Sequence, residues 1–179
     1  MVYVFLADGF EIIEALAPVD MLRRAKIDVK TVGVTGKLVE SSCGIKVESD
    51  MTIDEFEFYD VQAIVLPGGL QGTLNLESNL VVQNAIDNSV NTNTLICAIC
   101  AAPSILGHKN LLNGKIATCF PGFEDTLAGA QYAEEYVVKD GNFITARGAG
   151  VCIEFGLEIV KALKGADIAD EVRSTIQCQ

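Results

Sequence analysis

The segment LICAICAAPSILG, residues 95–107, places two cysteines three positions apart between an apolar run and a stretch of small residues. Residues 95–99 have the composition of a buried parallel strand, and residues 101–107 have that of a helix. Pro103 falls in the first turn of this helix, where its missing amide hydrogen costs no hydrogen bond. The segment therefore predicts a strand, a sharp turn at Cys100 and a helix.

The two cysteines have three interpretations: a redox pair, half of a metal site, or one reactive cysteine beside a buried one. In an extended strand Cys97 and Cys100 lie roughly 10 Å apart at Cα, beyond the reach of a disulfide. A zinc site needs further soft ligands, but the sequence has one histidine, His108, and no second closely spaced pair of cysteines. His108 is expected to be a surface or capping residue. The redox pair and the metal site are both disfavoured, and no metal is expected.

The third interpretation is a nucleophile elbow, in which a tight turn between a strand and a helix presents a reactive side chain. An elbow needs small residues two positions before and two positions after the nucleophile, so that neighbouring backbones can approach. Ala98 and Ala102 provide them around Cys100. The N-terminus of the following helix would favour the thiolate and lower the pKa of the Cys100 thiol. The residues alone favour this interpretation and two packed core cysteines equally.

Strand-like and helix-like stretches alternate along the rest of the chain. Apolar runs predict strands over residues 2–7, 28–34, 61–69, 93–100 and 115–120. Helical spacing predicts helices over residues 10–25, 78–90, 101–107 and 150–165, with Ser78 as an N-cap and Gly165 as a stop signal. Residues 37–53 are expected to form a hairpin, and residues 134–146 two strands joined around Asp140–Gly141. The pattern predicts a single domain over residues 1–179, a three-layer α/β structure with a mainly parallel sheet.

Four predicted strand ends carry residues suited to chemistry. They are Asp8–Gly9, Pro67–Gly69, Cys100 and Cys119–Pro121. Functional residues of a parallel sheet gather at the carboxyl ends of the strands, so we expect these four places to meet. Cys119 and Cys152 also lie near strand ends, and we expect both to be packed core cysteines.

The composition excludes several classes of protein. The formal net charge of −11 and the pI near 4.4 argue against nucleic acid or an anionic membrane surface as the main partner. The adjacent Arg23 and Arg24 are expected to be a solvated helix end. No apolar run reaches the ~18 residues that a membrane span needs. Residues 1–13 lack a basic region before their apolar stretch, which predicts a first strand and no signal peptide. The six cysteines are therefore expected to be reduced thiols in the cytoplasm.

Three further segments accompany the cysteine segment: DGFEIIEALAPVDMLRRA (residues 8–25), VLPGG (residues 65–69) and ITARGAGVCIEFGLEIVKAL (residues 144–163). In this order and spacing, from about residue 2 to about residue 173, the chain resembles the ThiJ/PfpI superfamily and its deglycase branch. The resemblance implies a flavodoxin-like α/β sandwich of the class I glutamine amidotransferase-like kind, and a homodimer.

The resemblance also implies a set of site residues. It carries the reactive elbow cysteine onto Cys100, its acidic partner onto Glu14, and the other glutamate position of the same loop onto Glu11. The apolar neighbours of Glu14 would raise the pKa of its carboxyl, and the protonated carboxyl could then donate a hydrogen bond to the Cys100 thiolate. The remaining candidates are Gly68, Phe120 and two expected oxyanion-binding N–H groups, those of Gly69 and Ala101.

The sequence departs from the superfamily's protease pattern at two positions. Protease members have a histidine directly after the cysteine, where this chain has Ala101, and other members take a histidine from the next strand end, where it has Phe120. His108 lies about two helical turns beyond Cys100 and can replace neither. Because no Cys–His dyad can be built, peptide hydrolysis by that route is disfavoured.

These observations favour an enzyme that acts on a small reactive carbonyl compound without a cofactor. The expected activity is of the glutathione-independent glyoxalase or deglycase kind, converting methylglyoxal or glyoxal to a 2-hydroxy acid with Cys100 as nucleophile. The alternative is a non-enzymatic oxidative-stress sensor or chaperone that works through oxidation of Cys100. An intracellular cysteine peptidase ranks third.

Overall fold

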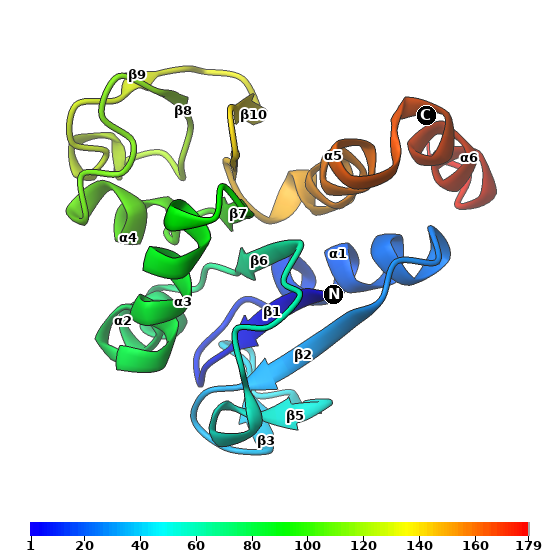
Figure 1. Cartoon of the computed structure of the whole chain (residues 1–179), viewed down its shortest axis with the longest axis horizontal. Coiled ribbons are helices and arrows are strands. Elements are labelled where there is room, and N and C mark those ends of the chain that lie inside the picture. Colours follow the sequence, from blue (N-terminus) through cyan, green and yellow to red (C-terminus); the bar gives the residue numbers. More distant parts are fainter. Residues whose placement is uncertain (179) are drawn as a thin grey trace.

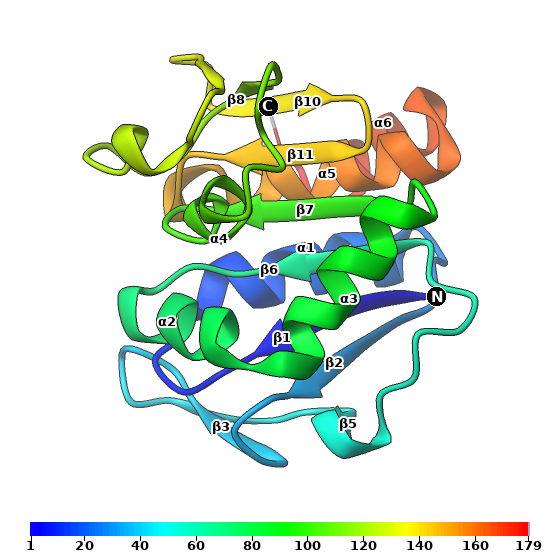
Figure 2. The ribbon, with the colours of Figure 1, turned by 60° about the vertical axis from the view of Figure 1, so that its left-hand side comes forward.

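A computed structural model describes residues 1–178, and seven of their strands form one sheet in the order β10-β11-β7-β6-β1-β2-β5 (Figures 1 and 2). Within this sheet β10 pairs antiparallel with β11, and the other pairs are parallel. The strands are β1 (Val2–Leu6), β2 (Val29–Gly33), β5 (Met51–Thr52), β6 (Ala63–Leu66), β7 (Leu95–Ile99), β10 (Val137–Asp140) and β11 (Phe143–Ala146). The prediction of a mainly parallel sheet is confirmed.

Helices cover both faces of the sheet, which explains why its central strands are apolar on both sides (Figure 2). One face carries α1 (Ile12–Arg24), α5 (Cys152–Lys164) and α6 (Ala166–Thr175), and the other carries α2 (Leu70–Ser78), α3 (Leu80–Asn91) and α4 (Pro103–His108). A separate apolar core fills the space on each side of the sheet. The three-layer α/β sandwich is therefore confirmed.

Shorter elements lie outside the main sheet. The predicted hairpin excursion is present as an antiparallel pair, β3 (Leu38–Glu40) and β4 (Lys46–Glu48). A second pair consists of β8 (Ile116–Ala117) and β9 (Gln131–Tyr132), so the strand expected over residues 115–120 is short and does not join the main sheet. Three 3-10 turns complete the described chain: Ile53–Glu55, Glu124–Thr126 and Ala149–Val151.

The prediction of Ser78 as an N-cap is wrong by one residue. Asn79 caps α3, because its side-chain oxygen accepts hydrogen bonds from the N–H groups of Val81 and Val82. Ser78 instead ends α2, a helix that the sequence pattern did not indicate. α6 was also missed, whereas Gly165 ends α5 as expected.

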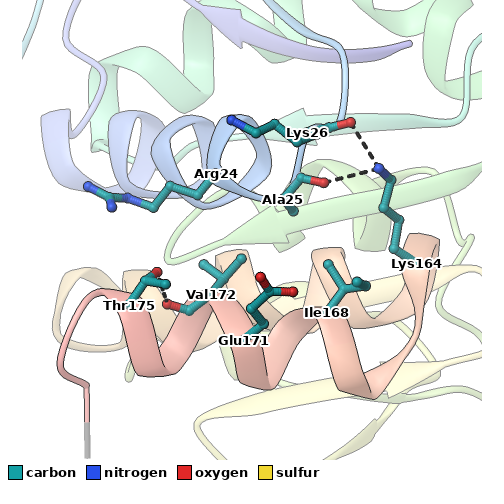
Figure 3. Close-up of a pocket in the computed structure, with 8 residues that line it drawn as sticks. All are labelled: Arg24, Ala25, Lys26, Lys164, Ile168, Glu171, Val172 and Thr175. Atoms are coloured by element: carbon teal, nitrogen blue, oxygen red, sulfur yellow. Dashed lines mark hydrogen bonds between the residues drawn. The ribbon is translucent and has the colours of Figure 1, made fainter.

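The C-terminal end of α1 is held against the neighbouring helices by Lys164 (Figure 3). The Lys164 ammonium donates hydrogen bonds to the carbonyls of Ala25, at 3.0 Å, and Lys26, at 2.9 Å, the two residues that follow α1. Arg23 pairs with Asp50 and Arg24 with Asp20, and these arginines are about half exposed. The expected solvated helix end is confirmed.

Gly107 is the position in α4 where we expect a small substitution to cost the most stability. A Cβ added there would lie 2.0 Å from the carbonyl oxygen of Thr126, which is backbone and cannot swing away. Gly107→Ala is expected to lower the free energy of unfolding by about 3 kcal/mol, measured by chemical denaturation. The matched control is Gly150→Ala, where nothing lies within 4 Å and little change is expected. Equal stability of the two variants would contradict this account of α4.

None of the helices within residues 1–178 is both long enough and apolar enough to cross a lipid bilayer.

Candidate active site

Cys100 stands on a strained turn directly after β7. Its φ angle is +65°, in the left-handed region that L-residues other than glycine rarely adopt. Neighbouring backbone holds the turn on both sides: the Cys100 N–H donates to Ala146 O at 2.8 Å, and the Cys100 carbonyl accepts from the Phe120 N–H at 2.8 Å. Pro103 is the first residue of α4. This geometry is that of the predicted nucleophile elbow.

The two cysteines of the segment differ in their surroundings. The Cys97 side chain is completely buried in the core against α1 and α5, and burial raises the pKa of its thiol. Cys100 is only half-buried, and neither cysteine is part of a disulfide. Cys97 is therefore a packing residue, and Cys100 is the accessible thiol.

Glu14, in the first turn of α1, is brought against Cys100 by a glycine. The Gly68 N–H donates to Glu14 Oε2 at 2.9 Å, and the Glu14 side chain is 1% exposed. A Cβ added at Gly68 would lie 2.5 Å from Glu14 Oε2 and 2.6 Å from Cys100 Cβ, so only glycine fits between them. Glu11 has a different role: it caps α1 by accepting the Glu14 N–H at 2.9 Å.

Burial sets the protonation of Glu14. Loss of solvent raises the pKa of its carboxyl to about 7; the negative charge of Glu11 adds to this, whereas hydrogen bonds from Cys100 and Gly68 oppose it. The carboxyl is therefore about half protonated at neutral pH, as the apolar sequence around it predicts. A group in this state can both accept and donate a proton.

The predicted lowering of the Cys100 pKa is wrong. Burial, followed by the charge of Glu14 and the hydrogen bond to it, raises the pKa of the thiol to about 12, and the N–H groups of Gly69 and Ala101 only partly oppose this. α4 begins at Pro103, three residues after Cys100. Protonation of Glu14 removes its charge, the second of these causes, whereas burial, the largest, remains.

Two backbone N–H groups face the sulfur. The N–H groups of Gly69 and Ala101 make backbone hydrogen bonds to Cys100 that lower the pKa of its thiol. From the sequence, these two donors are expected to bind an oxyanion. Gly69 has a φ of +84°, and a Cβ there would lie 2.3 Å from the carbonyl oxygen of Gly9. The ends of β1, β6 and β7 therefore meet at this place, as expected for functional residues of a parallel sheet.

Comparisons with known proteins agree with this geometry. The model of the DJ-1/PfpI family matches residues 1–162. The chain belongs to the DJ-1/PfpI family. The Parkinson disease protein 7 homolog of Danio rerio is 37% identical over 180 residues, which cover 97% of this chain and 94% of that protein.

Solved structures of DJ-1 proteins have the same flavodoxin-like fold. Drosophila melanogaster DJ-1beta has a TM-score of 0.95 at 33% identity and covers 99% of this chain and 97% of its own. A mutant of a DJ-1 superfamily protein from Salmonella typhimurium has a TM-score of 0.94 at 34% identity, over 99% and 98% of the two chains. An oxidized Toxoplasma gondii DJ-1 has a TM-score of 0.95 at 28% identity, over 99% and 97%.

A hollow of about 430 Å³ includes Phe120, whose N–H donates to the carbonyl of Cys100. It is lined by Phe120, Pro121, Tyr136, Arg147 and residues 148–151. A Cβ added at Gly148 would lie 3.2 Å from the Phe120 ring and 3.9 Å from Glu14 Oε1, so the hollow begins next to the Glu14 carboxyl. His108 is remote from it and pairs with Glu77 at 2.6 Å.

Sequence reasoning missed part of this DJ-1/PfpI site. Ala149 supplies a backbone hydrogen bond that lowers the pKa of Glu14, and Arg147 lines the hollow. The hairpin predicted around Asp140–Gly141 was the sequence signal that could have found these residues, because residues 147–151 directly follow its second strand, β11. Cys119 and Cys152 are both buried, as expected, yet the charge of Glu14 helps to raise the pKa of Cys152 to about 12.

Proposed function

We propose that this member of the DJ-1/PfpI family removes reactive carbonyl compounds such as methylglyoxal, with Cys100 as nucleophile. One observation carries the proposal: a half-buried thiol on a strained turn contacts a buried carboxyl, Glu14, with a pKa of about 7. A thiol beside a group that can take up its proton and return it is an arrangement that covalent catalysis at a carbonyl can use.

The first step is addition to the aldehyde. The Cys100 sulfur forms a bond to the aldehyde carbon, and the carbonyl π electrons move to oxygen. The N–H groups of Gly69 and Ala101 lie where they would stabilise the resulting oxyanion. Glu14 receives the thiol proton and can return it to this oxygen, giving a hemithioacetal with no change in net charge.

The second step moves a hydrogen within the adduct. Glu14 takes the proton from the former aldehyde carbon and an enediolate forms, with its negative charge on the former ketone oxygen. Glu14 returns the proton to the neighbouring carbon, and the hydroxyl proton passes from the former aldehyde oxygen to the former ketone oxygen, which gives a thioester of lactate. Water then cleaves the thioester, releasing lactate and the Cys100 thiol. The aldehyde carbon is oxidised while the ketone carbon is reduced, so the sequence consumes only water.

The same chemistry accounts for deglycase-like behaviour. Early adducts of methylglyoxal with amines and thiols are in equilibrium with the free aldehyde, so removal of the aldehyde pulls the adducts apart by mass action. We further propose a homodimer, which the family resemblance supports, and a cytoplasmic location, which fits the free thiols.

The decisive experiment follows the loss of methylglyoxal and the formation of lactate in the absence of glutathione. We expect the wild-type protein to form one lactate for each methylglyoxal consumed, at a rate well above that of buffer. If there is no turnover, while mild peroxide converts Cys100 stoichiometrically to a sulfinate, the enzymatic proposal is wrong.

That outcome would support a second function, an oxidative-stress sensor. The favouring observation is that the half-buried Cys100 lies beside a carboxyl able to donate a hydrogen bond to an oxidised sulfur. The oxidized Toxoplasma gondii relative makes oxidation of a DJ-1 protein a reasonable comparison. Peptide mass spectrometry of Cys100 distinguishes this role from turnover.

A further inference from the structure

Arg147 lies at the level of Cys100 in the sheet. β11 and β7 are parallel neighbours with Ala146 opposite Ile99, so Arg147 and Cys100 occupy the next position of the register. The Cys100 N–H bonds to the Ala146 carbonyl at 2.8 Å, which fixes this register up to the elbow. Arg147 lines the same hollow as Phe120, whose N–H donates to the Cys100 carbonyl at 2.8 Å, so Arg147 lies at the side of the site.

The Arg147 guanidinium is held in place by neutral groups. It stacks over the Tyr136 ring at 5.7 Å from the ring centre, and Nη1 donates to the carbonyl of Glu134 at 3.2 Å. The Arg147 N–H also bonds to the Tyr136 carbonyl at 3.0 Å, so the pair is anchored at the open end of the hairpin. A guanidinium has five N–H donors in a fixed fork, and one such bond leaves an edge of the fork available.

The charge of Arg147 is not matched by a nearby carboxylate. The other three arginines of the sequence pair with acids: Arg23 with Asp50, Arg24 with Asp20 and Arg173 with Glu154. Within residues 1–178, Arg147 has no carboxylate within 4.0 Å. This is unexpected in a chain with 24 acidic and 13 basic residues, where acidic partners are abundant.

Among the described residues that line the hollow, Arg147 is the only charged one, and the Glu14 carboxyl lies at the edge of the hollow. The rest of the wall consists of Phe120, Pro121, Tyr136 and residues 148–151. Burial and the charge of Glu124 raise the pKa of the Cys119 thiol, and the charge of Arg147 opposes them. The Glu124 carboxylate does not pair with Arg147 and instead accepts the Gly122 N–H at 2.8 Å. A single cation with spare donors in an apolar hollow is the arrangement that orients an anionic group.

We propose that the substrates are α-oxo aldehydes that carry an anionic group, a carboxylate or a phosphate, which Arg147 binds while the aldehyde reacts at Cys100. The inference rests on the proposed function for the reacting carbonyl and adds the substrate class. The bonds formed and broken are those already given, and Arg147 takes no part in them. It is a specificity-determining residue.

Two five-carbon substrates test the proposal directly. 4,5-Dioxopentanoate ends in a carboxylate and 2-oxopentanal ends in a methyl group, but both have the same α-oxo aldehyde. We expect wild-type kcat/KM to favour the carboxylate by about tenfold, against the repulsion from the net charge of −11. The phosphate ester of 3-hydroxy-2-oxopropanal, measured in parallel, shows which anion is preferred.

Matched variants assign the preference to Arg147. Arg147→Gln is expected to bring the ratio of the two kcat/KM values to about one or below. Arg24→Gln removes the same charge from the last turn of α1, whereas Glu14 lies in the first turn, and it should keep the wild-type ratio. Equal kcat/KM values in the wild-type protein, or a preference that survives Arg147→Gln, would overturn the proposal.

A second measurement does not depend on turnover. N-iodoacetylglycine and N-propyl iodoacetamide alkylate thiols alike but differ in a terminal carboxylate, and peptide mass spectrometry reports the rate at Cys100. In the wild-type protein we expect the reagent with the carboxylate to alkylate Cys100 severalfold faster than the neutral reagent. This preference should be lost in Arg147→Gln and kept in Arg24→Gln. If no carbonyl is turned over but this preference is present, the proposed function fails and the anion site stands. If turnover is present without either preference, the anion site fails alone.

Discussion

Cys100→Ser is expected to lower kcat/KM for methylglyoxal by at least about a thousandfold. The serine hydroxyl is close in size to the thiol and leaves the turn and its two backbone hydrogen bonds intact. Its oxygen is a much weaker nucleophile than sulfur, and an alcohol gives up its proton less readily than a thiol does. Lactate formation measures the loss, and chemical denaturation should show a stability within about 1 kcal/mol of the wild type.

Two other cysteine variants serve as controls for this result. Cys43→Ser changes an exposed thiol on the β3–β4 hairpin and should leave turnover unchanged. Cys97→Ala removes the other cysteine of the segment, which is fully buried, and should cost about 1 kcal/mol of stability while turnover is kept. Loss of turnover in Cys97→Ala as large as that in Cys100→Ser would restore the interpretation of a cysteine pair.

The apolar strand, the flanking alanines and Pro103 all lie within residues 95–107, so local residues allowed the elbow to be proposed. They did not distinguish it from two packed core cysteines, and the family resemblance decided between the two. The resemblance likewise selected Glu14, because the residues alone favoured an exposed helix glutamate there. Helix α2 could not be predicted from the sequence pattern, because residues 70–78 include Gly72 and lead directly into the next helix at Asn79.

The pKa of Cys100 depends on contacts that no short segment shows. Its thiol is opposed by the charge of Glu14, a residue 86 positions earlier, and by burial that only the packed sheet creates. The role of Arg147 depends on the register of β11 against β7, which alternation along one strand does not specify. Local patterns therefore allow the nucleophile to be proposed, whereas its electrostatics and the proposed role of Arg147 require the tertiary structure.

Glu14→Gln is expected to lower kcat/KM for methylglyoxal by roughly a hundredfold to ten-thousandfold. The amide matches the carboxyl in shape, and its oxygen can accept the Gly68 N–H as Glu14 Oε2 does. It cannot take up a proton from Cys100 or return one to the substrate, so the hydrogen transfer loses its carrier. A loss of less than about threefold would show that Glu14 has no part in proton transfer.

The same variant should separate reactivity of the thiol from catalysis. The charge of Glu14 raises the pKa of Cys100, so removing that charge is expected to lower it. Alkylation of Cys100 by iodoacetamide at pH 8 should therefore be at least as fast in Glu14→Gln as in wild type. Slower alkylation together with slower turnover would mean that the variant has disturbed the elbow.

The stability of Glu14→Gln provides the test of the buried carboxyl itself. Its pKa rises from the ordinary 4.5 to about 7 on folding, so protonation favours the folded state. This contribution is fully present below about pH 4.5 and is lost as pH rises through 7, which amounts to up to roughly 3 kcal/mol. Chemical denaturation at pH 5 and pH 8 should show a smaller fall in stability for Glu14→Gln than for wild type. An equal fall in both proteins would place the titrating group elsewhere, and the proton carrier proposed here would then lack its physical basis.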